Sequence, residues 1–206
     1  ASEDFYKEHQ AVFEGMEVEL VSDQVMKEIS DTMTPQGVLA LVRMLEYSLE
    51  DLLQQENPLL LVLENLQDPG NLGTILRTGA GINGIIMSRE TVDIYNPKVT
   101  RSTMGSIFRV PFVYVDDLFE VIKMMKDRNI TTYAAHLNGT DYTRESYTSG
   151  TAFLIGNEGN GLTDELTDNA QKKIKIPMCG RVESLNAAMA SGLLVYEARR
   201  QRQGVD

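Results

Sequence analysis

From residue 59 onward, short apolar runs alternate with helical patterns, and this alternation restricts the fold more than any other feature of the chain. The run LLLVLEN, which begins at Leu59, is apolar almost without interruption. Such a run indicates a strand buried on both faces, as in a parallel sheet. Further strands are expected in GIIMS, RVPFVYV, ITTYAAHLNG, GTAFLI and KIKI, with helices between them. The pattern predicts an α/β domain with a mostly parallel sheet flanked by helices.

The first 45 residues follow a different pattern. Residues 1 to about 33 are acidic and largely helical in pattern, with a short strand possible in VFEGMEVELVS. The segment TPQGVLALVRM predicts a turn followed by an apolar strand over 38–44. Charge and polarity rise between residues 46 and 57, which favours a domain boundary there. We therefore predict a small α/β N-terminal unit with its linker over 1–45 and the main domain over 46–206.

Composition excludes several classes of protein. A single cysteine, Cys179, excludes an internal disulfide and is typical of a reducing compartment. With only His9 and His136 beside it, the chain has too few soft ligands for a zinc site. No apolar run is long enough to span a bilayer, so we expect a cytoplasmic protein with neither metal nor membrane partner. The net charge of −11 argues against a general nucleic-acid binder, although residues 89–109 carry a local basic segment.

Three loops, each after a predicted strand, carry polar side chains and glycines. The first contains Asn71 and Arg77 in NLGTILR, and the second, GNEGNG, contains Glu158. The third runs from Ile176 to the final helix, with Ser184 at the expected N-cap position. Ligands of open α/β sheets bind at the carboxyl ends of the strands, so these loops predict a binding site.

Structural roles would also explain these residues. Asn71 suits a helix cap, Arg77 a surface ion pair and Glu158 an exposed turn. Neither G-x-G-x-x-G nor a P-loop is present, which disfavours a nucleotide-dependent oxidoreductase.

Taken together, NLGTILRTGAG, FLIGNEGNGL and IPMCGRVESLNAAMASGLLVYE resemble the three motifs of the SpoU family of RNA 2′-O-ribose methyltransferases, within the SPOUT class. The resemblance covers about residues 35 to 200. The family has Val-Ser where this chain has Ala187 and Ala188. TPQGVLALV resembles the join from the family's small, ribosomal-protein-like RNA-binding domain, so residues 1–45 correspond to part of that domain.

The resemblance implies the fold, the cofactor and the reaction. The expected fold is a parallel sheet whose C-terminal segment forms a trefoil knot, in a homodimer. S-adenosylmethionine is the expected cofactor, bound in the knot. The expected reaction methylates a ribose 2′-hydroxyl of ribosomal or transfer RNA. A non-catalytic RNA-binding relative is the alternative, which the presence of the catalytic motif residues disfavours.

Site residues follow from the same resemblance. The predicted catalytic residues are Asn71, Arg77, Glu158, Ser184 and Asn186. The predicted cofactor contacts are Leu137, Gly156, Asn157, Gly159, Ile176, Met178 and Leu185. The predicted RNA contacts are Arg101, Ser102 and Arg109. Because a guanidinium is hard to deprotonate, we expect Arg77 to hold a phosphate or stabilise the 2′-alkoxide rather than act as a base.

Overall fold

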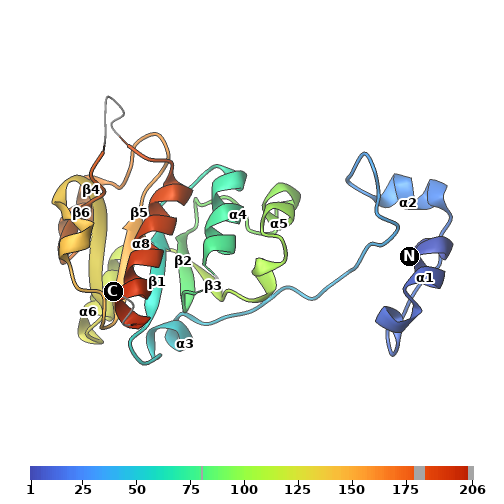
Figure 1. The fold of residues 1–206 in the computed structure, drawn as a ribbon, viewed down its shortest axis with the longest axis horizontal. Helices are drawn as coiled ribbons and strands as arrows, with labels where there is room; N and C mark the ends of the chain where they lie inside the picture. The colour runs from blue at the N-terminus through green and yellow to red at the C-terminus, as the bar shows by residue number, and fades with distance from the viewer. Residues whose placement is uncertain (80, 179–183, 204–206) are drawn as a thin grey trace. The chain divides into compact units, whose positions relative to one another are not determined.

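The computed structural model describes residues 1–79, 81–178 and 184–203 and divides into two compact units, 1–45 and 46–206. The second unit is built on a six-stranded sheet in the order β3-β2-β1-β5-β4-β6, in which every paired strand is parallel (Figure 1). Its strands are β1 (Leu59–Leu63), β2 (Gly84–Ser88), β3 (Phe112–Val115), β4 (Thr131–Asp141), β5 (Thr151–Ile155) and β6 (Lys172–Lys175). The prediction of a parallel sheet flanked by helices is confirmed.

Strand β1 lies at the centre of this sheet. Leu61 is in register with Ile85 of β2 on one side and with Phe153 of β5 on the other. All five residues of β1 are buried. A strand with neighbours on both edges and helices on both faces has no solvent-facing side, which explains its unbroken apolar run.

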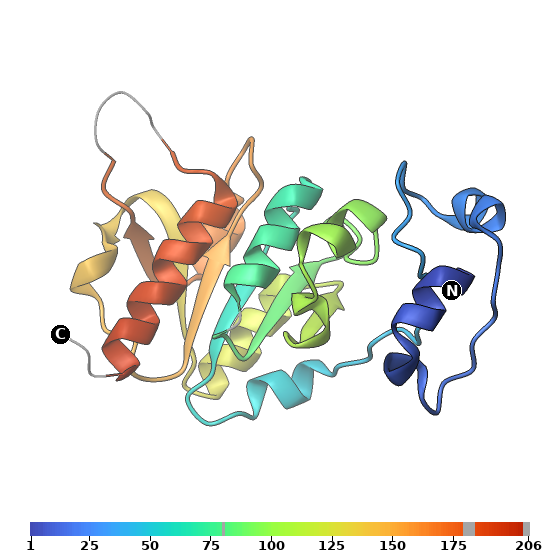
Figure 2. The same cartoon turned by 45° about the vertical axis from the view of Figure 1, so that its right-hand side comes forward.

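Helices cover both faces of the sheet (Figures 1 and 2). Leu60 and Val62 of β1 share one core with α3 (Leu49–Leu53), α6 (Leu118–Asp127) and α7 (Asp164–Asn169). On the opposite face, α4 (Pro69–Thr78) packs against α8 (Ala187–Gln203), and α8 also contacts β1 and β5. Shorter helices α5 (Pro97–Ser102), η2 (Ser106–Phe108) and η3 (Tyr142–Arg144) lie in the connections.

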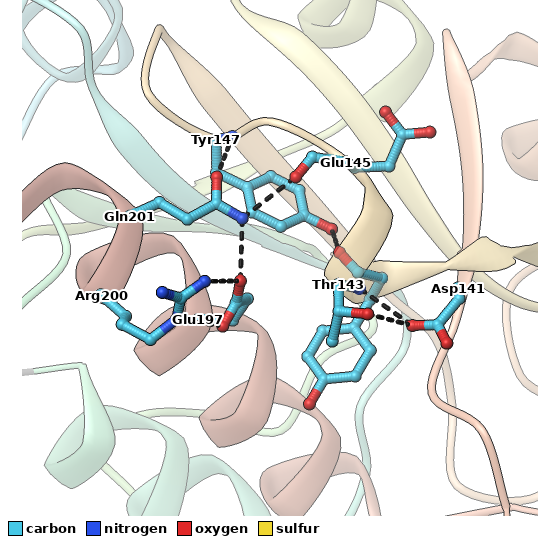
Figure 3. A network of polar contacts seen from close by, with 8 residues as sticks. Asp141, Thr143, Glu145, Tyr147, Glu197, Arg200 and Gln201 are labelled. Atoms are coloured by element: carbon cyan, nitrogen blue, oxygen red, sulfur yellow. Dashed lines mark hydrogen bonds and ion pairs between the residues drawn. The ribbon is translucent and has the colours of Figure 1, made fainter. Parts of the chain in front are cut away.

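The C-terminal half of α8 is tied to the segment that follows β4 (Figure 3). The Tyr147 amide donates to Gln201 Oε1 at 2.9 Å, and Gln201 Nε2 donates to the Glu145 carbonyl at 3.0 Å and to Glu197 Oε1 at 2.8 Å. The Arg202 guanidinium donates to the backbone carbonyls of Asn57, Pro58, Tyr147 and Ser149. These bonds fix α8 at one end, so that its N-terminus is held over the carboxyl edge of the sheet.

The first unit is helical rather than α/β. It contains α1 (Glu3–Glu8), η1 (Gln10–Phe13) and α2 (Asp23–Ile29), and the only β pairing within residues 1–45, all of which are described, is one bridge between Ser2 and Val21. The predicted strand over 38–44 is wrong: these residues have no regular structure, and Leu41 is 97% exposed. A strand needs neighbours for its N–H and C=O groups, and residues 1–45 supply none. No helix in the described part of either unit is long and apolar enough to cross a membrane.

Candidate active site

The site lies where the carboxyl ends of β1, β5, β4 and β6 meet at one edge of the sheet. These four strands are neighbours in the sheet, and all are parallel. The loops that follow them therefore emerge side by side. The chain leaves β1 toward β2 on one side and leaves β5 toward β6 on the other, so the connections diverge between β1 and β5. Open α/β sheets form ligand crevices at such a position.

Glu158, in the loop after β5, joins that loop to the one after β1. Its Oε1 accepts from the Asp68 amide and from Asn71 Nδ2, both at 3.0 Å, and its Oε2 accepts from the Gln67 amide at 3.2 Å. Glu158 is exposed in a turn, as the structural alternative predicted, but its carboxylate also joins the two loops through these three hydrogen bonds. Burial by itself raises the pKa of Glu158, but the donors from Asn71, Asp68 and Gln67 outweigh that effect, and the pKa lies below its usual range. Glu158 is thus ionised at neutral pH.

Asn186 extends this network to the start of α8. Its Nδ2 donates to Asn71 Oδ1 at 2.8 Å, while its Oδ1 accepts from the amides of Ala188 at 2.9 Å and Met189 at 3.3 Å. Asn186 is therefore the N-cap of α8, and the prediction that Ser184 fills this position is wrong. The helix begins two residues later than the sequence indicated, which leaves the exposed Ser184 without a capping role.

The start of α4, unlike that of α8, lies earlier in the chain than the sequence indicated, because the cap is not Asn71. Asp68 is its N-cap, accepting from the Asn71 amide at 2.8 Å, and Pro69 occupies the first turn. Asn71 is therefore not a cap, and its side chain is free to bridge Glu158 and Asn186. The Asp-Pro pair is a recognised helix-start signal that would have located this boundary from the sequence.

Arg77 stands apart from the network. It is exposed on α4, one residue before the last helical residue, Thr78, and no described residue forms a hydrogen bond or ion pair with its guanidinium. The alternative of a surface ion pair with a carboxylate is not what the described residues show. The site thus holds a tightly bonded carboxylate–amide chain together with a cation whose donors are unused.

The glycine-rich loop 156–161 closes on itself. Asn157 and Gly161 exchange backbone hydrogen bonds of 3.0 and 2.8 Å, and Asn157 Nδ2 donates to the Asn65 carbonyl at 2.8 Å. A β-carbon on residue 156 would lie 2.0 Å from the Gly161 carbonyl carbon and the Leu162 amide nitrogen. Only glycine fits there, because the loop returns directly against its own start.

A buried carboxylate that the sequence reasoning missed supports this loop from behind. Glu64, immediately after β1, is 8% exposed, and it accepts from both the amide and the hydroxyl of Thr163 at 2.8 Å. The same hydroxyl accepts from the Leu166 amide and caps α7. A Glu directly after a buried apolar run was the available signal, because a buried carboxylate requires partners.

The predicted cofactor contacts follow β4, β5 and β6. Pairing of β4 with β6 breaks between Ala135 and Thr140, and Leu137 in this irregular stretch is 63% exposed. Ile176 and Met178 follow β6, and Leu185 precedes α8; all three are half-buried. Asn157 Oδ1 accepts from the Gly159 amide at 2.8 Å, so the polar end of Asn157 is used within its own loop. Cys179, interpreted from the sequence as a small loop residue, lies outside the described residues.

The predicted RNA contacts lie on α5 and beyond η2. Arg101 and Arg109 are exposed, and Ser102 is half-buried. The Ser102 hydroxyl donates to the Val99 carbonyl at 2.8 Å, and the Pro69 carbonyl lies 3.4 Å away. The structure therefore places α5 directly against the first turn of α4, which carries Asn71.

The carboxyl edge of the parallel sheet carries the Glu158 carboxylate and the carboxamides of Asn71 and Asn186, and α4 adds Arg77, which has no partner among the described residues. The protein is therefore an open-sheet α/β protein with a polar site at its strand ends. Comparison with known proteins makes the assignment specific. The chain belongs to the SpoU rRNA methylase family, whose profile matches residues 58–196, and a profile for RNA 2′-O ribose methyltransferase substrate binding matches residues 7–48.

Individual relatives agree with this assignment. The chain is 37% identical over 190 residues to an uncharacterised tRNA/rRNA methyltransferase of Synechocystis, covering 89% of this chain and 67% of that protein. It is 32% identical over 194 residues to the 23S rRNA (guanosine(2553)-2′-O)-methyltransferase RlmP of Bacillus subtilis, covering 90% and 73%. The AdoMet-bound rRNA methyltransferase of Sinorhizobium meliloti has a TM-score of 0.85 at 35% identity, covering 97% of this chain and 78% of that one.

Proposed function

We propose that this protein transfers a methyl group from S-adenosylmethionine to a ribose 2′-hydroxyl of ribosomal RNA. The observation that carries the proposal is the hydrogen-bonded chain from Asn186 through Asn71 to Glu158. Asn71 lies on the same helix as Arg77, whose guanidinium has no partner among the described residues. Membership of the SpoU family supports the reaction class. The B. subtilis and S. meliloti relatives are named for ribosomal RNA, which favours it over transfer RNA.

The residues around β4, β5 and β6 fit an adenosyl cofactor. Leu137 exposes an apolar side chain at the strand ends, and Ile176, Met178 and Leu185 add half-buried apolar surface. Gly156 and Gly159 lie in the closed loop between them and offer backbone groups without side chains in the way. Apolar walls with a few polar backbone groups are what a nucleoside site requires. When bound, S-adenosylmethionine supplies an electrophilic methyl group on a sulfonium.

Within this site, the chain's own residues position the RNA. We assign to Arg77 the role of binding the phosphate or stabilising the developing 2′-alkoxide. No described residue accepts from its five donors, and its charge is permanent. The Asn71 carboxamide, held by Glu158 and Asn186, fixes the polar surface beside it. Ser184, freed from capping, can hydrogen-bond to the ribose. When the 2′-hydroxyl accepts the methyl group that S-adenosylmethionine would supply, its proton would leave to a phosphate oxygen or water.

Three further features belong to the same proposal. Residues 1–45 are part of an RNA-binding unit, supported by the substrate-binding profile over 7–48. The C-terminal part of the chain forms the trefoil knot of the SPOUT class. Two copies associate through α8, on which Met189, Leu193 and Tyr196 form an exposed apolar stripe at helical spacing. A ribosomal RNA substrate places the reaction in the cytoplasm.

The proposal is tested by incubating the full chain with radiolabelled S-adenosylmethionine and transcribed, unmodified 23S rRNA or tRNA, then mapping 2′-O-methyl positions. We expect one methylated nucleotide in rRNA, and loss of transfer in Arg77→Ala with S-adenosylhomocysteine binding retained in calorimetry. Binding of both RNA and cofactor without transfer would identify a non-catalytic relative instead.

A further inference from the structure

Two apolar side chains are exposed in the middle of the basic segment beside α4. The backbone turns at Met104 and Gly105, which have positive φ values of 50° and 82°, before entering η2. Ile107 and Val110 are buried and anchor the turn. Phe108, next to Ile107, is nevertheless 59% exposed, and Met104 is 70% exposed.

This exposure is unfavourable in the protein alone. Leaving a phenylalanine ring in water forgoes the hydrophobic gain of burying it, and a left-handed methionine adds backbone strain. Such strain persists where the surrounding structure fixes it, and it clusters at binding sites. The buried neighbours thus hold Met104 and Phe108 at the surface, which points to an external partner.

The charge of the surroundings identifies the kind of partner. From Pro97 to Val115 the chain contains Lys98, Arg101 and Arg109 and no acidic residue, although the whole protein has a net charge of −11. Lys98 and Arg109 are exposed, and their side-chain cations form no hydrogen bond or ion pair with a described residue. We call the exposed side chains of Lys98, Arg101, Met104, Phe108 and Arg109 the α5–η2 surface. A cationic segment that also exposes an aromatic ring matches a polyanion that presents flat apolar faces.

The α5–η2 surface is fixed next to the candidate active site. A β-carbon on Gly73 of α4 would lie 1.6 Å from Ser102 Oγ and 3.1 Å from the Ser102 carbonyl carbon, so α4 and α5 touch along their backbones. The same helix α4 carries Asn71 and Arg77, and η2 also contacts it. The α5–η2 surface is therefore carried by elements that pack against the helix of Arg77.

We propose that Phe108, with Met104 four residues before it, is a stacking platform for an unpaired base of the RNA substrate, with Lys98 and Arg109 on the flanking phosphates. The inference rests on the proposed RNA methyltransferase function and adds the requirement for an unstacked base near the target ribose. Because every base has a π-face, the platform selects single-stranded over paired RNA rather than a particular sequence.

The test uses a single-stranded oligoribonucleotide containing one 2-aminopurine, whose fluorescence is quenched on stacking, and the same strand in a duplex. Phe108→Leu removes the ring and keeps an apolar side chain, whereas Phe108→Tyr keeps the ring. We expect Phe108→Leu to weaken single-strand binding by roughly 5- to 150-fold, the range that corresponds to stacking of one base. The quenching should be lost with it, and Phe108→Tyr should restore both.

Charge is tested separately with Lys98→Ala against Lys123→Ala, an exposed lysine on α6. Only Lys98→Ala should reduce the slope of log affinity against log salt, by about one. Wild-type quenching and affinity in Phe108→Leu, in a protein that still methylates RNA, would overturn the platform and leave the proposed function intact. If the wild type neither binds nor methylates RNA, both fail. A change of oligomeric state in Phe108→Leu would instead assign the surface to contacts between copies.

Discussion

Asn186 offers a sharp test because its two amide atoms have different tasks. The oxygen caps α8 through the amides of Ala188 and Met189, and the nitrogen donates to Asn71 Oδ1 at 2.8 Å. Asn186→Asp keeps the capping oxygen and replaces the donor by a second acceptor. It therefore separates the stability of the helix from the integrity of the network.

The expected changes in the free energy of unfolding follow from these bonds. Aspartate and asparagine are similar N-caps, so Asn186→Asp loses about 1 kcal/mol for one hydrogen bond. A negative charge at a helix N-terminus returns about 0.3–1 kcal/mol of that. Asn186→Ala loses the cap, worth about 1 kcal/mol, in addition to the hydrogen bond, for a total of about 2 kcal/mol. Urea unfolding should therefore place Asn186→Asp near the wild type and Asn186→Ala well below it.

Activity should follow the network rather than the stability. The ionised Glu158 accepts from Asn71 Nδ2, which leaves Asn71 Oδ1 facing residue 186 as an acceptor. A carboxylate at position 186 repels that oxygen, so the carboxamide must shift away from the position we assign it beside the ribose. A displacement of about 1 Å at a reacting centre costs about 100-fold in rate.

The assay is single-turnover methyl transfer to transcribed 23S rRNA at saturating cofactor, with Asn169→Asp on α7 as the matched control. A wild-type rate in Asn186→Asp, or a loss of stability equal to that of Asn186→Ala, would refute the assignment of the two amide atoms.

Three further outcomes are expected. Because folding lowers the pKa of Glu158, the ionised carboxylate stabilises the fold fully above the unfolded pKa of 4.5, and this stabilisation is lost as the pH falls through the folded pKa. The unfolding free energies of wild type and Glu158→Gln should therefore converge only below about pH 4.5, and a constant difference at lower pH would contradict this. Ser184→Ala should leave the melting temperature unchanged, because Asn186 caps α8, while lowering kcat; a fall in melting temperature would restore the capping role. Gly156→Ala should destabilise the protein by about 1–3 kcal/mol and weaken S-adenosylhomocysteine binding in calorimetry, because its β-carbon meets the backbone of Gly161; wild-type affinity would exclude the loop from the cofactor site.

The sheet was predictable because burial on both faces leaves a direct mark on composition. The run at Leu59–Leu63 and the later apolar runs each became a parallel strand. The segment at 38–44 has the same apolar character but no strand to pair with, and it remained irregular. Periodicity reports what a residue prefers to contact, whereas strand formation also depends on partners elsewhere in the chain.

Residues of the candidate site were predictable from the motifs, but their connections were not. Glu64 and Thr163 lie 99 positions apart, and Asn71 and Asn186 lie 115 apart. Hydrogen bonds over such separations leave no periodic signal in the sequence. The start of α8 was misplaced for a related reason. Ser184 and Asn186 both suit an N-cap, and only the hydrogen bond from Asn186 to the distant Asn71 accompanies the capping by Asn186 in the fold.

The division of labour among the predicted catalytic residues follows from which polar groups are already bonded. Hydrogen bonds already occupy the carboxylate of Glu158 and both carboxamide atoms of Asn71 and Asn186. Their partners are one another or backbone amides. Forming new bonds to RNA would require breaking these, at about 1 kcal/mol or more each. Arg77 has no bond to a described residue, and Ser184 does not cap α8, so both are able to engage substrate at no such cost. We therefore propose that the network is a rigid support and that the groups that touch the reacting ribose are those that it leaves unbonded.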